Sequence, residues 1–141
     1  VVIVYCGDTD TFHIVDEYLQ AEAVTSKHAE AFHEYIAKWN IDALFIDHAA
    51  AQFAMDLANT YDISTIKAKK DVLPGIAYVQ TLVENGRLKV APHCKEVLRM
   101  LDQYQWDKES SSGVEKPKHD GSTGVVHMAD AVRYALYTYT L

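Results

Sequence analysis

One carboxylate and one imidazole lie three residues apart near the C-terminal end of the chain, in an otherwise apolar stretch. They are Asp130 and His127, within HMADAVRYAL at residues 127–136. Side chains three residues apart on a helix face the same way. An ionised carboxylate on an apolar helix requires a cation, a metal or several donors, because burying it alone is very costly. Asp130 is therefore a candidate metal ligand, and His127 a candidate for binding Mn²⁺ or positioning a water molecule.

A second acid, Asp47, ends the most apolar predicted strand of the chain, at residues 41–47. In open α/β sheets ligands gather beyond the carboxyl ends of the strands, which is where Asp47 lies. Carboxylate oxygens from a strand end and a packed helix suit Mg²⁺ or Mn²⁺. Two such ions can clamp an in-line phosphodiester displacement.

Local structural roles are open for the same residues. Asp47 can cap the helix that is predicted to begin near Ala49. Asp130 can pair with Arg133 or bond to His127, which can itself be a structural histidine. The remaining histidines show no zinc-site spacing, and zinc is not predicted; they are His13, His28, His33, His48, His93 and His119.

Three lysines, Lys67, Lys69 and Lys70, follow a short strand that is predicted to lie beside the one ending in Asp47. They are candidates for contacting the scissile phosphate or the neighbouring DNA backbone; a solvated strand end is the alternative. The formal net charge is −7. This charge argues against coating nucleic acid by bulk electrostatics, so any DNA contact must be local.

Composition bounds the class of protein. The chain has 141 residues, 49% hydrophobic and 23% charged, which predicts a single globular domain over residues 1–141. It shows no phosphate-binding loop of the Gly-x-x-x-x-Gly-Lys type, no signal peptide and no membrane span. Its two cysteines predict free thiols in a reducing compartment. Because it opens at Val1, we expect it to be a fragment of a larger protein.

Hydrophobic periodicity predicts strands and helices in a mixed order. The first two strands should form a hairpin, and the Ser/Lys/Gly/Glu-rich segment at residues 107–124 should be a mobile surface loop before the last helix. This order predicts an α/β fold with a central mixed sheet flanked by helices. The expected strands are residues 1–6, 12–19, 41–47, 63–67 and 86–90, and the expected helices before that loop are residues 21–39, 49–59, 73–84 and 95–104.

The element order, with Asp47 in ALFIDHAAAQ and Asp130 in HMADAVRYALYTY, resembles the nuclease domain of tailed-phage large terminase subunits. The resemblance extends through FHIVDEYLQ, IKAKKDVLPGIAYVQTLVENGRLKV and LDQYQWD. It implies a ribonuclease H-like fold whose first strand, carrying the first catalytic aspartate, precedes the hairpin and is missing from this sequence. Asp8 and Asp10 lie in the hairpin turn and are poor substitutes for that acid.

The resemblance also implies a function. Two Mg²⁺ or Mn²⁺ ions, held by Asp47, Asp130 and His127, would cut concatemeric double-stranded DNA during packaging of the viral genome. The implied partners are double-stranded DNA, an upstream ATPase domain of the same polypeptide, the phage portal and the small terminase subunit, in the host bacterial cytoplasm and without a membrane. Activity of this chain without the first-strand acid is left open. The alternatives are a resolvase-type or transposase-type nuclease on the same fold, and a non-catalytic docking module for the portal or the motor.

Overall fold

The computed structural model describes residues 1–103, 105–107, 116–118 and 123–139. Strands β1 (Val2–Cys6) and β2 (Thr11–Asp16) form the predicted hairpin, with antiparallel pairing. Strand β5 (Leu88–Val90) adds to β2 in parallel, so that the order in this sheet is β1-β2-β5. The predicted mixed sheet is thus present.

A second, parallel pair consists of β3 (Phe45–Ile46) and β4 (Ile66–Lys67). The short helix η1 (His48–Ala50) and the helix α2 (Ala51–Tyr61) connect these two strands. Among the described residues this pair is a separate sheet, whereas the sequence predicted one central sheet. The residues that follow β3 and β4 lie at the same end of the pair, because the two strands run in parallel.

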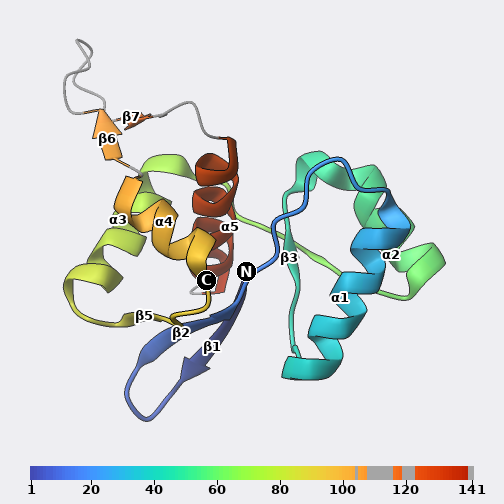
Figure 1. Cartoon of the computed structure of the whole chain (residues 1–141), viewed down its shortest axis with the longest axis horizontal. Coiled ribbons are helices and arrows are strands. Elements are labelled where there is room, and N and C mark those ends of the chain that lie inside the picture. The colour runs from blue at the N-terminus through green and yellow to red at the C-terminus, as the bar shows by residue number, and fades with distance from the viewer. Residues whose placement is uncertain (104, 108–115, 119–122, 140–141) are drawn as a thin grey trace.

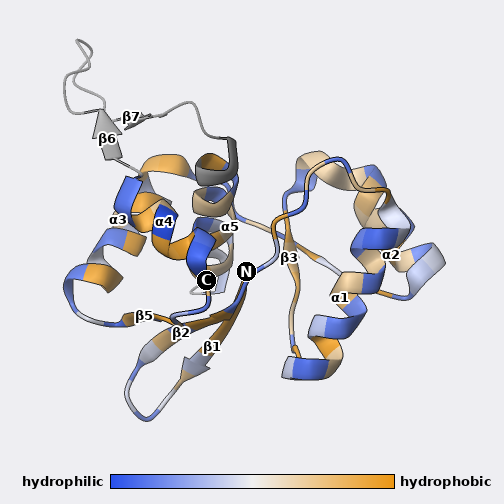
Figure 2. Ribbon diagram, viewed as in Figure 1, coloured by the Kyte–Doolittle hydropathy of each residue, from blue (hydrophilic) through white to orange (hydrophobic). Residues whose placement is uncertain are grey.

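Helices α3 (Val72–Glu84), α4 (Lys95–Gln103) and α5 (Thr123–Tyr139) pack over the first sheet (Figure 1). Apolar residues recur on α5 at intervals of four, which places them on one buried face. Figure 2 shows apolar stretches on α3 and α4. The buried residues of this core are Phe12, Ile14, Leu82, Cys94, Val97, Met100, Met128, Val132 and Leu136.

A smaller core lies between α1 (Thr25–Trp39), α2 and β3. Its buried members are Ala29, Leu57 and Ile63. The sequence predicted that α1 begins at residue 21, but it begins at Thr25, because Glu22 has a left-handed backbone with φ 55° that cannot continue a helix. α5 contacts α3 and α4 as well as β3, so that it joins the two cores.

The predicted mobile loop at residues 107–124 falls largely outside the described residues. Its described parts are regular structure, and its mobility stays a prediction. β6 (Gln105–Asp107) pairs antiparallel with β7 (Lys116–Lys118), and α5 begins at Thr123. The polar composition did not indicate this pairing, since backbone hydrogen bonds need no apolar pattern. Within the described ranges, no helix is long and apolar enough to cross a bilayer.

Candidate metal centre

Asp47 lies directly after β3, where the apolar run Phe45–Ile46 ends. Its Oδ1 atom accepts a hydrogen bond from the backbone N–H of Ala49 at 2.9 Å and so caps η1. The predicted capping role is therefore present. It orients the carboxylate but leaves the side chain 35% exposed, so that the acid remains accessible to a ligand.

Lys70 approaches the same carboxylate from beyond β4. Its Nζ atom lies 2.8 Å from Oδ1 of Asp47. The hydrogen bond from Lys70, followed by that from Ala49, holds the pKa of Asp47 below its ordinary value. The bond to Asp47 raises the pKa of Lys70, and the negative charge of Asp130 raises it further. Asp130 is thus within electrostatic reach of Lys70.

Asp130 reaches this point from α5, which contacts β3. Its Oδ1 atom lies 3.4 Å from Nη1 of Arg133, so the predicted pairing one turn along the helix is present. The Asp130 side chain is 32% exposed, whereas that of Arg133 is only 7% exposed. The structure therefore gathers two acids and one ammonium from β3, α5 and the segment after β4.

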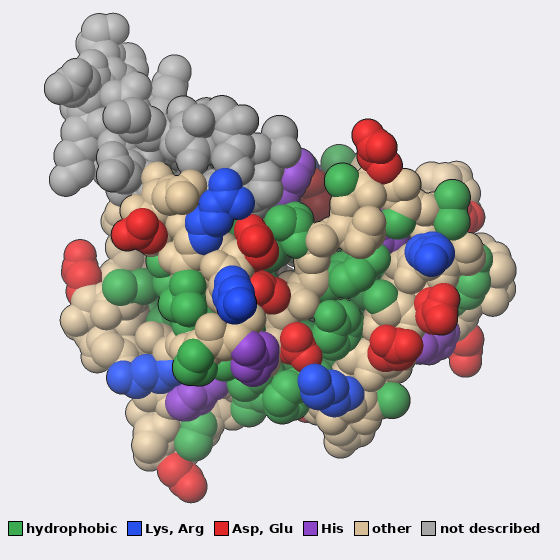
Figure 3. Space-filling view, viewed as in Figure 1, with side chains coloured by type: hydrophobic (Ala, Val, Ile, Leu, Met, Phe, Trp, Pro, Cys, Tyr) green, Lys and Arg blue, Asp and Glu red, His purple; other side chains and the backbone are tan. Residues whose placement is uncertain are grey.

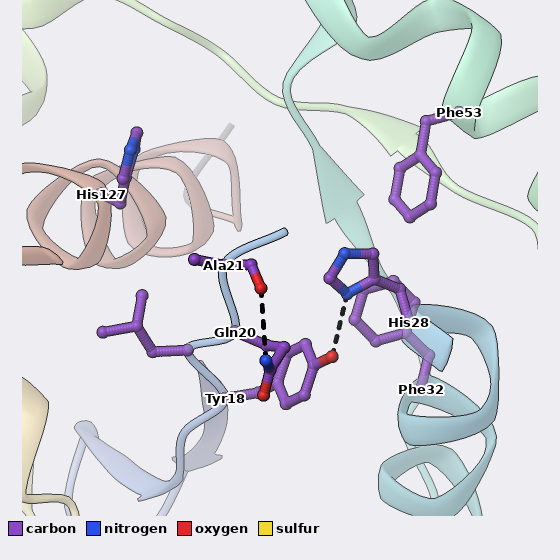
Figure 4. Close-up of a pocket in the computed structure, with 8 residues that line it drawn as sticks. Tyr18, Gln20, Ala21, His28, Phe32, Phe53 and His127 are labelled. Carbon is purple, nitrogen blue, oxygen red and sulfur yellow. Dashed lines mark hydrogen bonds between the residues drawn. The ribbon is translucent and has the colours of Figure 1, made fainter. Parts of the chain in front are cut away.

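His127 lies one helical turn before Asp130 and is exposed. It lines an open hollow of about 480 Å³, whose other walls come from residues 18–21, α1 and α2. Figure 4 shows His127 across residues 20–21 from His28, whose Nδ1 atom is hydrogen-bonded to Tyr18 Oη at 2.9 Å. The described contacts therefore support neither a metal-binding nor a structural role for His127 over the other.

Lys67 and Lys69 are exposed at the strand end next to Asp47, as predicted. The backbone N–H of Lys69 donates to Thr138 Oγ1 at 2.8 Å and ties this strand end to α5. On the face in Figure 3, Lys and Arg side chains are interspersed with acidic ones.

The donors suit a hard cation only in part. Asp47 and Asp130 supply carboxylate oxygens, the ligands that Mg²⁺ and Mn²⁺ prefer, and both already interact with the positive charge of Lys70. Within the described ranges, however, no group of three or more His, Cys, Asp or Glu side chains is placed to hold a metal ion. The two acids thus fit part of a divalent-metal site and need at least one further ligand.

Sequence reasoning missed two features of this region. It treated the lysines as one group, although Lys70 alone among them pairs with Asp47 in the described contacts. It also named Arg133 only as a partner of Asp130, although Arg133 is nearly buried against Gly75 of α3. The available signal was Gly75 itself. Glycine destabilises a helix interior, so a glycine within a helical pattern often indicates that another group packs closely against the helix there.

The mixed sheet β1-β2-β5 covered by helices matches the architecture of a ribonuclease H-like domain. The chain matches the terminase RNase H-like domain family over residues 1–138, and it belongs to that family. It is 40% identical over 139 residues to the large terminase subunit of Escherichia phage T5, an alignment that covers 96% of this chain and 31% of that protein.

Solved structures give the same result. The large terminase of a thermophilic bacteriophage, in complex with ADP, has a TM-score of 0.79 and 28% identity, covering 98% of this chain and 35% of that one. The complex of the same terminase with ATP-gamma-S has a TM-score of 0.71 and 29% identity, covering 84% and 30%. The chain therefore spans about a third of the length of these relatives.

Proposed function

We propose that this chain is the nuclease domain of a phage terminase large subunit, a divalent-metal-dependent endonuclease that cuts concatemeric double-stranded DNA during genome packaging. The observation that carries the proposal is that Asp47 pairs with Lys70 at the end of the β3–β4 pair, while α5, which bears Asp130, contacts β3 and places that acid within electrostatic reach of the same lysine. Membership of the terminase RNase H-like domain family supports it, as does the 40% sequence identity to a large terminase subunit.

In this proposal Asp47 and Asp130 hold two Mg²⁺ or Mn²⁺ ions, with His127 completing one ion's ligands or orienting a water molecule. Such ions supply an activated water molecule and stabilise the leaving 3′ oxygen. The chain's own residues orient the ligands: the N–H of Ala49 fixes the carboxylate of Asp47. Lys67, Lys69 and Lys70 lie at the same strand end, where they can contact backbone phosphates without reading the base sequence.

The remaining acid would come from a strand ahead of β1. Among the described strands β1 pairs only with β2, and β3 pairs only with β4, so each has one edge with unused backbone hydrogen-bonding groups. Figure 1 shows β1 and β3 on opposite sides of the N-terminus. Because the relatives are about three times as long, we further propose an upstream ATPase domain, contacts with the portal and the small terminase subunit, and action in the cytoplasm of the infected host.

The test is cleavage of linear and supercoiled DNA with Mn²⁺ and with Mg²⁺. It compares this chain with a version extended upstream. Each is tested without substitution and with Asp47→Asn, Asp130→Asn or the control Asp42→Asn. Asp42 is an exposed acid at the opposite end of the segment that forms β3, so the control removes one negative charge outside the site. We expect both site variants to abolish cleavage, while circular dichroism shows a folded protein and the control keeps its activity. Retained cleavage in either site variant would contradict the assignment.

The alternative of a docking module has one observation in its favour: both acids already have local partners, Ala49 for Asp47 and Arg133 for Asp130. Calorimetric titration with Mn²⁺ separates the two functions. The nuclease requires ion binding that depends on Asp47 and Asp130. Absence of ion binding in both the chain and its extended version would favour the docking module.

A further inference from the structure

Arg133 is a nearly buried cation in the middle of α5. Only 6% of its surface is exposed, and it is the only charged residue among the buried residues that the structure describes. Its aliphatic stem crosses Gly75 of α3: a Cβ atom added at Gly75 would lie 2.8 Å from both Cγ and Cδ of Arg133. The glycine thus provides the space through which the arginine passes, and a larger residue would displace it.

The guanidinium is incompletely satisfied in this position. Nη1 lies 3.4 Å from Oδ1 of Asp130, and Cζ lies 5.0 Å from the ring centroid of Tyr134. Nε is buried and has no hydrogen-bond partner among the described residues. Burying a cation with an unpaired donor is costly, and a buried ion pair is weak evidence for a stabilising role. Stability alone therefore does not account for an arginine at this position.

The Arg133–Asp130 pair differs in exposure from a second ion pair of the chain. Arg99 and Glu96 on α4 form an ion pair of the same spacing, with Nη1 3.5 Å from Oε2, but their side chains are 47% and 39% exposed. A pair of that kind contributes little and rearranges freely. The stem of Arg133 is confined by α3, so its charge stays beside Asp130, which is also within electrostatic reach of Lys70.

We infer that Arg133, confined by the space over Gly75, is a positioning residue that holds the carboxylate of Asp130 in the orientation required for metal binding. The inference rests on the proposed nuclease function and adds a requirement to it. A lysine would keep the charge, but its flexible stem and compact ammonium would not hold that charge where Nη1 of Arg133 lies, 3.4 Å from Oδ1 of Asp130. Gly75 acts one step further away, because it determines where the arginine can lie.

The test uses the full polypeptide that contains this chain, with Arg133→Lys, Gly75→Ala and the matched control Arg99→Lys. Crystal structures without divalent ions report the Asp130 conformer, and calorimetry reports the Mn²⁺ dissociation constant. We expect Asp130 to leave its native conformer in both Arg133→Lys and Gly75→Ala. Mn²⁺ binding should weaken about tenfold, the lower end of what loss of a ligand-orienting partner produces. Cleavage should lose kcat in the same proportion with KM for DNA unchanged, and Arg99→Lys should behave as the native protein.

Circular dichroism and urea unfolding of both variants separate a change at Asp130 from misfolding, because a Cβ atom at Gly75 would overlap the stem of Arg133. An unchanged Asp130 conformer in the two variants would overturn the inference, even if the protein is a nuclease. Equal effects of Arg99→Lys and Arg133→Lys would overturn it too. If Asp130 moves as expected but the native protein binds no Mn²⁺, the positioning contact is supported and the proposed function fails.

Discussion

Replacing Lys70 with methionine tests the electrostatics of the site most directly. The change removes the ammonium whose Nζ atom lies 2.8 Å from Oδ1 of Asp47 and keeps a chain of similar length. The side chains of Lys70 and Asp47 are 33% and 35% exposed, so that solvent partly screens the pair. Exposed ion pairs contribute little to stability because water and salt screen them. Urea unfolding at pH 7 should therefore show only a small loss in the free energy of unfolding.

The same pair gives a pH dependence with a definite sign. The pKa of Asp47 is lowered in the folded state from 3.8, so its contribution is present above that value and is lost as the pH falls through the lowered pKa. The pKa of Lys70 is raised from 10.5, so its contribution is present below that value and is lost as the pH rises through the raised pKa. The stability difference between the native protein and Lys70→Met should therefore be constant from about pH 5 to pH 9 and should disappear at both extremes.

Metal binding should change in the opposite direction from stability. A divalent ion at Asp47 must displace the ammonium of Lys70, so removing the ammonium removes a competitor for the carboxylate. The Mn²⁺ dissociation constant of Lys70→Met should therefore fall in calorimetry, by less than about tenfold because the pair is exposed. Lys69→Met is the control, because Lys69 is exposed and its described bond to Thr138 uses the backbone N–H. An unchanged or larger dissociation constant in Lys70→Met would refute the reasoning.

Two further predictions concern the core and the thiols. Leu82 has no exposed surface in the larger core, so Leu82→Ala should lower the free energy of unfolding in urea by about 2–5 kcal/mol. Val83 lies on the same helix but is 48% exposed, so Val83→Ala should lower it far less. Similar losses for both variants would contradict the packing described. Hydrogen bonding from Thr9 lowers the pKa of the Cys6 thiol, whereas burial raises the pKa of the Cys94 thiol. A thiol reagent should therefore label Cys6 rapidly and Cys94 only in denaturant. Equal labelling rates in the folded protein would be inconsistent with the burial of Cys94.

Local sequence patterns predicted the elements well wherever periodicity or turn chemistry was strong. The β-branched run and the Gly7–Asp10 turn predicted the hairpin, which forms as β1 and β2. The apolar spacing at Ala29, Phe32 and Ile36 predicted α1, although its first turn was wrong because of the backbone at Glu22. The strands at residues 41–47 and 63–67 were predicted too long. In the described sheets, each of these segments contributes only two residues to the strand pairing.

The sequence by itself determined which residues could do chemistry at this site: Asp47 after an apolar strand, Asp130 three residues from His127 on the last helix, and lysines after a neighbouring strand. These assignments depend only on the order of residues along the chain, since an acid that directly follows an apolar strand lies at the carboxyl end of that strand. Tertiary structure alone decided which of them meet. Lys70 rather than Lys67 or Lys69 pairs with Asp47, and His127 lies beside the hollow lined by His28. Burial of Arg133 depends on how closely α5 approaches Gly75 of α3, and that distance results from the packing of the whole core rather than from any local pattern.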